Sequence, residues 1–222
     1  MPEVSISAEL KNRCPKLRLG CIGANVVVAS SGEGLLAEIK GSLEIIQQSL
    51  IIEDISKIPA IEASRKAYKA CGKDPARYRL SAEALLRRVV SGKGLYLINN
   101  VVDQLNLVSV TSGFSIGGYD ADKIQGTISF GIGQPDEPYA GIGRGELNIE
   151  NLPVFRDQLG AFGTPTSDSQ RTEVSSETSN FLMILIDFGG FDQLQTAKEM
   201  AIRFLKEYCQ ATNINEYNIA IF

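Results

Sequence analysis

Predicted helices precede predicted strands along most of this chain, and that order limits the folds open to it. Apolar residues recur at helical spacing between residues 33 and 50, as at Leu36, Ile39 and Leu43. Gly72 is placed to end the second helix, and Ser81 to cap the third. The predicted helices cover residues 33–50, 58–70, 82–90, a short stretch starting near Asn100 and Asp103, and 193–209.

Strand patterns dominate from about residue 108, where glycine becomes more frequent. Turns are expected at Gly117-Gly118 and at Gln134-Pro135-Asp136. The predicted strands cover residues 17–28, 112–116, 127–131, 145–149, 154–156, 181–186 and 219–222. Segregated helices and short strands predict an α+β fold with mixed or antiparallel sheets and packed helices.

The length of 222 residues suits one large domain. We expect residues 1–60 to form a strand-helix extension packed on residues 61–222. No apolar run approaches the roughly 18–20 residues of a membrane span, and Met1 to Ser5 do not begin an export signal. These features predict a cytoplasmic protein without a membrane partner. The four scattered cysteines fit no zinc spacing, so we expect reduced thiols and no metal.

The chain contains no histidine. This excludes mechanisms that use a Ser-His or Cys-His pair or a histidine-bound metal. A general base would have to be a carboxylate, a lysine, a substrate group or a held water. The glycine-rich segments match neither a dinucleotide fingerprint nor a phosphate loop, so no cofactor is expected.

Residues 65–93 carry nine basic and two acidic residues, a local net charge of +7. The whole chain is −4, so the remainder sums to −11. A cationic segment in an anionic protein predicts a polyanionic partner, with nucleic acid the first to consider, and the interleaved tyrosines (Tyr68, Tyr78, Tyr96) suit stacking on unpaired bases. RNA is the expected partner, and no DNA is expected. The alternative is a pair of solvated helix faces. The predicted RNA-binding residues are Arg65, Lys69, Arg77, Arg79, Arg87, Arg88 and Lys93.

Two polar segments could line a site. Asn99, Asp103 and Asn106 could share one helix face, although capping or a buried network would also explain them. The loop 163–172 offers hydroxyls, a carboxylate and a guanidinium that could hold a water or a ribose-phosphate. Its alternative is a solvated loop in which Asp168 pairs with Arg171.

Several motifs resemble one known family. They are Gly72-Lys73-Asp74-Pro75, Arg77-Tyr78-Arg79, Leu85-Leu86-Arg87-Arg88, Asn99-Asn100-Val101-Val102-Asp103, Gly118-Tyr119-Asp120 and Pro165-Thr166-Ser167-Asp168-Ser169. Together they resemble the B3/B4 domain of the phenylalanyl-tRNA synthetase beta subunit, in its stand-alone version. In the synthetase this domain hydrolyses tyrosine wrongly esterified to the phenylalanine tRNA. The resemblance therefore implies a B3/B4-like fold and a tRNA or aminoacyl-tRNA partner.

The resemblance also implies candidate site residues for an aminoacyl-tRNA deacylase acting in trans. The candidate catalytic carboxylates are Asp103, Asp120, Glu146 and Asp168. The candidate pocket residues are Asn99, Asn106, Tyr119, Thr166, Ser167, Ser169, Arg171, Thr172, Thr178 and Asn180. The chain departs from the family at Gly117 and Ile184, where bacterial synthetases carry a histidine and a glutamate. Two alternatives remain open: a non-catalytic module that recruits tRNA or a synthetase, and an amino-acid sensor without RNA.

Overall fold

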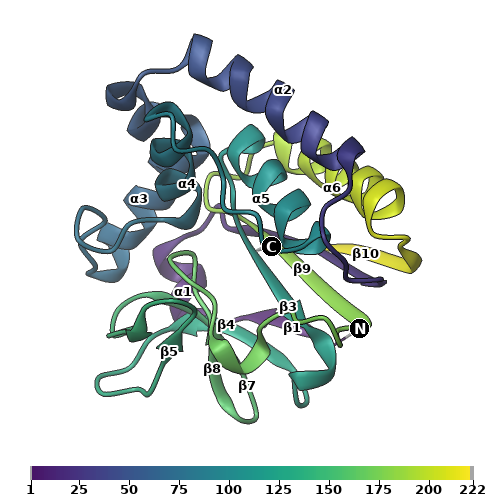
Figure 1. Ribbon diagram of the computed structural model, residues 1–222. Helices are drawn as coiled ribbons and strands as arrows, with labels where there is room; N and C mark the ends of the chain where they lie inside the picture. Colours follow the sequence, from purple (N-terminus) through teal and green to yellow (C-terminus); the bar gives the residue numbers. More distant parts are fainter. Residues whose placement is uncertain (1, 221–222) are drawn as a thin grey trace.

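Strand β9 (Asn180–Asp187) organises the fold because both of its faces are buried. The computed structural model describes residues 2–220 and stacks three layers: helices, a four-stranded sheet that contains β9, and a second four-stranded sheet (Figure 1). Phe181 and Met183 pack toward the helices, while Leu182 and Ile184 pack toward the second sheet. The continuous apolar run of β9 therefore supplies two hydrophobic cores at once.

The two sheets draw on distant parts of the chain. The central sheet is antiparallel and runs in the order β10 (Thr212–Ala220), β2 (Arg18–Asn25), β9, β3 (Ser115–Asp120). The second sheet runs β1 (Val4–Ile6), β4 (Ile128–Ile132), β7 (Pro153–Asp157), β8 (Gly160–Gly163), with β1 parallel to β4. Strands β5 (Ala140–Gly141) and β6 (Gly145–Glu146) form a small hairpin. Residues 2–60 thus contribute one strand to each four-stranded sheet.

Helices cover the face of the central sheet that points away from the second sheet (Figure 1). They are α2 (Glu33–Ser49), α4 (Ser81–Val90), α5 (Asn100–Ser112) and α6 (Gln193–Tyr208). Helix α3 (Pro59–Cys71) contributes side chains to both cores, and α1 (Ala8–Arg13) packs into the core between the sheets. Short 3-10 turns, η1 (Ile52–Lys57), η2 (Ala121–Lys123) and η3 (Gln170–Thr172), connect these elements. The predicted α+β fold is confirmed.

The helix ends test the local predictions. Gly72 ends α3 with φ of 89°, as predicted. The predicted Ser81 cap is wrong: Leu80 holds the cap position, and the Ser81 amide instead donates to Pro165 O at 2.8 Å. Helix α5 starts at Asn100 as expected but is capped by Asn99, whose side chain accepts from the Val102 amide at 2.9 Å.

The predicted turn at Gly117-Gly118 is also wrong, because both glycines lie inside β3. A Cβ at Gly117 would lie 2.0 Å from Tyr119 Oη, and one at Gly118 would lie 2.5 Å from Leu105 Cδ1. The glycines therefore allow close packing on both faces of the strand. Strand β6 is shorter than its predicted range, and Ile221 and Phe222, which end the last predicted strand, lie outside the described residues.

All four cysteines are free and buried, in agreement with the expected reduced thiols. Within residues 2–220, no helix combines the length and the apolar character needed to cross a bilayer.

Substituting Gly117→Ala tests the close packing in β3. Tyr119 cannot swing away freely, because its hydroxyl also lies 2.2 Å from where a Gly163 Cβ would be. We expect the free energy of unfolding to fall by roughly 1–3 kcal/mol, the usual cost of overpacking. Chemical denaturation measures it.

The matched control is Gly41→Ala, at a position within α2 where an added Cβ meets nothing within 4 Å. It should stabilise the protein by about 0.5–1 kcal/mol through helix propensity. Equal stability changes in the two variants would contradict the packing argument.

Candidate functional site

A cleft of about 570 Å³ lies between the helical layer and two loop regions, the β5–β6 hairpin and the loop 164–168. Helix α4, the segment 91–98, helix α5 and strand β3 form one part of its wall. Ile142 and Arg144 of the β5–β6 hairpin and the loop 164–168 form the other. The cleft lies along β3 because β3 is an edge strand, so its outer side is not covered by another strand.

The loop 164–168 is held by many internal hydrogen bonds, which argues against the alternative of a solvated loop. Thr164 Oγ1 accepts from the amides of Thr166 and Ser167 at 3.2 and 3.0 Å. Tyr68 Oη and Thr166 Oγ1 are 2.9 Å apart, and Tyr139 Oη donates to Ser167 O at 2.6 Å. A loop fixed by so many internal bonds can present its side chains in one geometry.

Asp168 is the central polar group of the cleft. Its Oδ2 accepts from the Gly118 amide at 3.3 Å, whereas its Oδ1 is buried without a hydrogen-bond partner. Burial raises the pKa of Asp168 to about 7 against the opposing effects of the Gly118 amide and the nearby Tyr119 hydroxyl. Tyr119 Oη is also buried and unpaired, and burial, with the nearby Asp168 charge, raises the pKa of that hydroxyl.

A carboxyl group with a pKa near 7 can exchange a proton at neutral pH or hold a cation. The expected Asp168–Arg171 pair is wrong, because Arg171 lies against Asp157 instead. Arg171 Nη2 and Asp157 Oδ1 are 2.8 Å apart, and Nη1 and Oδ2 are 3.1 Å apart. Burial acts to raise the pKa of Asp157, but the bonds from Arg171 hold that pKa below its ordinary value.

Part of the cationic segment is neutralised inside the protein. Glu83 is 1% exposed and accepts from Arg65 Nη1 at 2.8 Å and from Arg87 Nε at 3.2 Å. Arg79 Nε lies 4.0 Å from the same carboxylate. Three of the predicted RNA-binding arginines therefore share one buried carboxylate, and their free charge is smaller than the sequence indicated.

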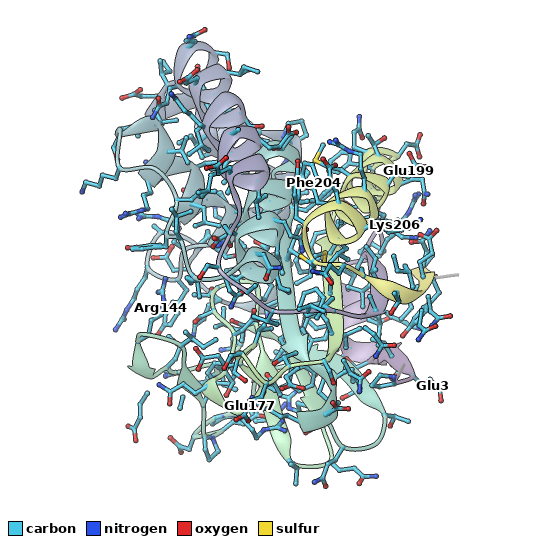
Figure 2. All side chains as sticks on the ribbon, turned by 45° about the vertical axis from the view of Figure 1, so that its right-hand side comes forward. Glu3, Arg144, Glu177, Glu199, Phe204 and Lys206 are labelled. Carbon is cyan, nitrogen blue, oxygen red and sulfur yellow. The ribbon has the colours of Figure 1, made fainter. Side chains whose placement is uncertain are left out.

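Three further cations, Arg88, Lys93 and Arg144, line the cleft and form no ion pair with any described residue. Lys93 and Arg144 are exposed, whereas Arg88 is half-buried and its Nε is buried without a hydrogen bond. Arg144 is exposed at the surface between the helical layer and the second sheet (Figure 2). The Arg88 guanidinium stacks 3.8 Å from the centre of the Tyr96 ring, and Tyr96 is 58% exposed.

The other two predicted stacking tyrosines do not serve this surface. Tyr68 is fully buried, and Tyr78 lies beneath Lys73 Nζ at 3.9 Å. Lys69 and Arg77 are exposed but do not line the cleft. Only Tyr96 therefore offers an aromatic face at the cleft.

Of the four candidate catalytic carboxylates, Asp168 alone lines the cleft. Asp103 accepts from Ser31 Oγ at 2.5 Å and from the Ile98 amide at 2.8 Å, which makes it a structural residue. Asp120 accepts from Thr178 Oγ1 at 2.9 Å. Glu146 is exposed on β6 and lines a separate depression.

The candidate pocket residues divide in the same way. Asn106, Thr166 and Ser167 line the cleft, and Tyr119 lies buried beneath Gly117. The others lie elsewhere: Asn99 caps α5, Ser169 caps η3, Arg171 pairs with Asp157, Thr172 is buried, Thr178 bonds Asp120 and Asn180 bonds Asp122.

Several contributors to the cleft were not predicted from the sequence, among them Arg144, Glu173 and the Gly118 amide. The glycines on both sides of Arg144 indicate a turn, but they do not indicate that Arg144 lines a cleft.

Gly117 and Ile184, where the chain departs from the family, are register partners on neighbouring strands. Ile184 packs in the core between the sheets, as does Tyr119. The two departures therefore lie behind β3 and not in the cleft.

Within residues 2–220, no group of three or more Cys, Asp or Glu side chains could hold a metal.

Comparison with known proteins gives two findings. A family model described as the B3/4 domain matches residues 63–216. An N-terminal fragment of the phenylalanyl-tRNA synthetase beta-subunit from Pyrococcus horikoshii superposes on 97% of the chain with a TM-score of 0.51 and 15% sequence identity. This chain spans 53% of that fragment, and at this identity the likeness supports the fold alone. No curated protein matches the chain.

The substitution Asp168→Asn tests the burial of the Asp168 carboxyl group. Its folded-state pKa of about 7 lies above the ordinary 3.8. Between about pH 4 and pH 7 the carboxyl group is therefore protonated in the folded state and ionised in the unfolded state. The free energy of unfolding should therefore fall as pH rises from 4 to 7, and the variant should lack this loss. Above pH 7 we expect the variant to be more stable, by at most about 4 kcal/mol.

Asp157→Asn is the matched control, because the pKa of Asp157 is shifted in the opposite direction from that of Asp168. Its folded-state pKa is lowered, so the carboxylate stabilises the protein above its ordinary pKa and loses this effect as pH falls. This variant should be less stable than wild type at pH 7, and the difference should shrink only as pH falls below the ordinary pKa of 3.8. Thermal melts across pH 2–8 measure both variants, and parallel curves for the two would contradict the assignment.

Proposed function

This chain belongs to the B3/4 domain family, and from that premise we propose that it binds tRNA with the aminoacylated 3′ end in the cleft. The one observation that carries this proposal is the layout of the cleft. Lys93 and Arg144 are exposed where they line it, Arg88, Asn106 and Asp168 are half-buried, and Thr166 is buried. The phosphates of a polyanion could contact the three cations, and a small polar group at its end could contact Asn106, Thr166 and Asp168.

Each part of the cleft matches one part of such a ligand. Exposed cations supply phosphate contacts, and the exposed Tyr96 ring offers a stacking face for an unpaired base. The arginine already stacked on Tyr96 adds a guanidinium plane to that surface. A volume of about 570 Å³ falls within the range of roughly 300–1,000 Å³ seen for pockets that enclose small ligands.

The triple substitution Arg88→Ala, Lys93→Ala, Arg144→Ala tests RNA binding. If each side chain contacts a phosphate, removing all three should reduce the salt dependence of log K by about 2–3. The affinity for tRNA should fall on the order of a hundredfold at about 0.1 M salt. Fluorescence anisotropy with labelled tRNA at several salt concentrations measures both quantities.

Lys206→Ala is the control. Lys206 is exposed on α6, on the opposite side of the molecule from Arg144 (Figure 2). Its loss should leave affinity and salt slope almost unchanged. An equal effect of the control and the triple variant would contradict binding at the cleft. Wild-type protein that binds free amino acids but no tRNA would favour a sensor instead.

A second candidate function is hydrolysis of the aminoacyl ester, and Asn106 favours it. Its half-buried amide lines the cleft and makes no hydrogen bond to any described residue. An amide donor in a wall beside an activated ester can stabilise the developing oxyanion or hold the attacking water. No histidine is needed for such a reaction.

The variant Asn106→Ala separates the two candidates. With a panel of correctly and wrongly charged tRNAs, a deacylase should release amino acid above the buffer rate, and the variant should be slower by about 10²–10³-fold. A binding module should retain charged tRNA without releasing the amino acid. Release by wild type and variant at equal rates would remove the role given to Asn106.

A further inference from the structure

Asp168 presents one oxygen that the protein leaves unsatisfied. Oδ1 is buried, makes no hydrogen bond, and belongs to a residue that lines the cleft. A buried carboxylate oxygen without a partner is costly, and native proteins seldom keep one without a use. The atom is therefore the strongest sign in the cleft of a missing ligand group.

No cation of the described residues forms an ion pair with Asp168. Arg171 is bound to Asp157, Arg87 to Glu83, and Arg88 is stacked on Tyr96. Tyr119 Oη is close enough to Asp168 to favour its ionised form, but a neutral hydroxyl cannot balance the charge of a buried carboxylate. A ligand group that completes Asp168 must therefore carry positive charge, and it adds to the hydroxyl of Tyr119.

The edge of β3 supplies a second acceptor beside Asp168. The Gly118 amide points away from β9 and toward Asp168 Oδ2. In an antiparallel ladder the amide and the carbonyl of one residue point to the same side, so Gly118 O also faces the open edge. A carboxylate oxygen and a carbonyl oxygen together suit a group with several donors.

We propose that Asp168 and the Gly118 carbonyl bind the α-ammonium group of the aminoacyl ester. The protein then accepts tRNA that carries a free amino acid and rejects tRNA whose amino acid is N-acylated. This inference rests on the proposed function of the cleft. The ammonium lies at the carboxylate while the phosphates of the same ligand meet Arg88, Lys93 and Arg144.

The electrostatics of the cleft agree with this assignment. The pKa of Asp168 near 7 describes the carboxyl group without a cation, and a bound ammonium would lower it. An N-acylated amino acid offers one amide donor and no charge, and it adds bulk at a place enclosed by the 164–168 loop. Asp168 acts here as a binding residue, which leaves any attacking water to other groups of the cleft.

The test measures binding of three forms of one tRNA to the full-length protein at pH 7.5. The forms are uncharged tRNA, tRNA carrying an amino acid through a stable 3′-amide link, and the same species N-acetylated, prepared for several amino acids. We expect the aminoacyl form to bind about tenfold to a hundredfold more tightly than the acetylated form, the effect of one charge-assisted contact.

The variants Asp168→Asn and Asp168→Ser should bring this ratio to about one. The ratio is taken within each variant, so a change in the affinity for uncharged tRNA that follows from the altered bond to the Gly118 amide does not affect it. Glu146→Gln, the same chemical change at an exposed carboxylate outside the cleft, should keep the wild-type ratio. Equal binding of the aminoacyl and acetylated forms by wild type would overturn the inference and leave tRNA binding standing. Absence of binding to every form would overturn the proposed function itself.

Discussion

The free edge of β3 is the constraint on which the site depends. Gly117 and Gly118 carry no side chains, so Tyr119 can fold back beneath the strand on one face and Leu105 can approach on the other. The outward amide of Gly118 then binds Asp168 and fixes the loop 164–168 against the sheet. Together with the bonds that Tyr68 and Tyr139 make to the loop, this contact holds Asp168 at the edge of β3.

Part of the positive charge of residues 65–93 is neutralised by Glu83 inside the protein. Glu83 gathers Arg65, Arg79 and Arg87 into one buried cluster, which secures α4 against α3. What remains for a ligand is a small group of cations lining the cleft that includes Arg144 from a different part of the chain. Electrostatic recognition is thereby focused on the cleft and not spread over two helix faces.

The sequence predicts those parts of the fold that have regular periodicity. The apolar run of β9 and the amphipathic pattern of α6 are read correctly because local burial determines them. The strand predicted at 112–116 overlaps only the start of β3, and the rest of β3 is mistaken for a turn because its glycines are selected by contacts with Tyr119 and Leu105, which are set by the tertiary fold. The resemblance to the B3/B4 domain is confirmed at the level of the family and fold, although the matched region starts at residue 63 and β2 lies before it.

The site is predictable only in part. The loop 163–172 and residues 87–93 are identified from composition, but their meeting in one cleft is not visible in the chain. Asp168 has Arg171 as a close sequence neighbour, yet Asp157 takes that arginine because the β7–β8 hairpin brings it nearer. Which carboxylate remains unpaired is thus a property of the folded structure.

The most direct measurement of the central claim is amide chemical-shift mapping with a short acceptor-stem RNA that ends in an amide-linked aminoacyl adenosine. The account predicts shifts concentrated in α4, the segment 91–98, Gly118 and the loop 164–168. Shifts confined to α6 and to β10, which forms the opposite edge of the central sheet from β3, would contradict it.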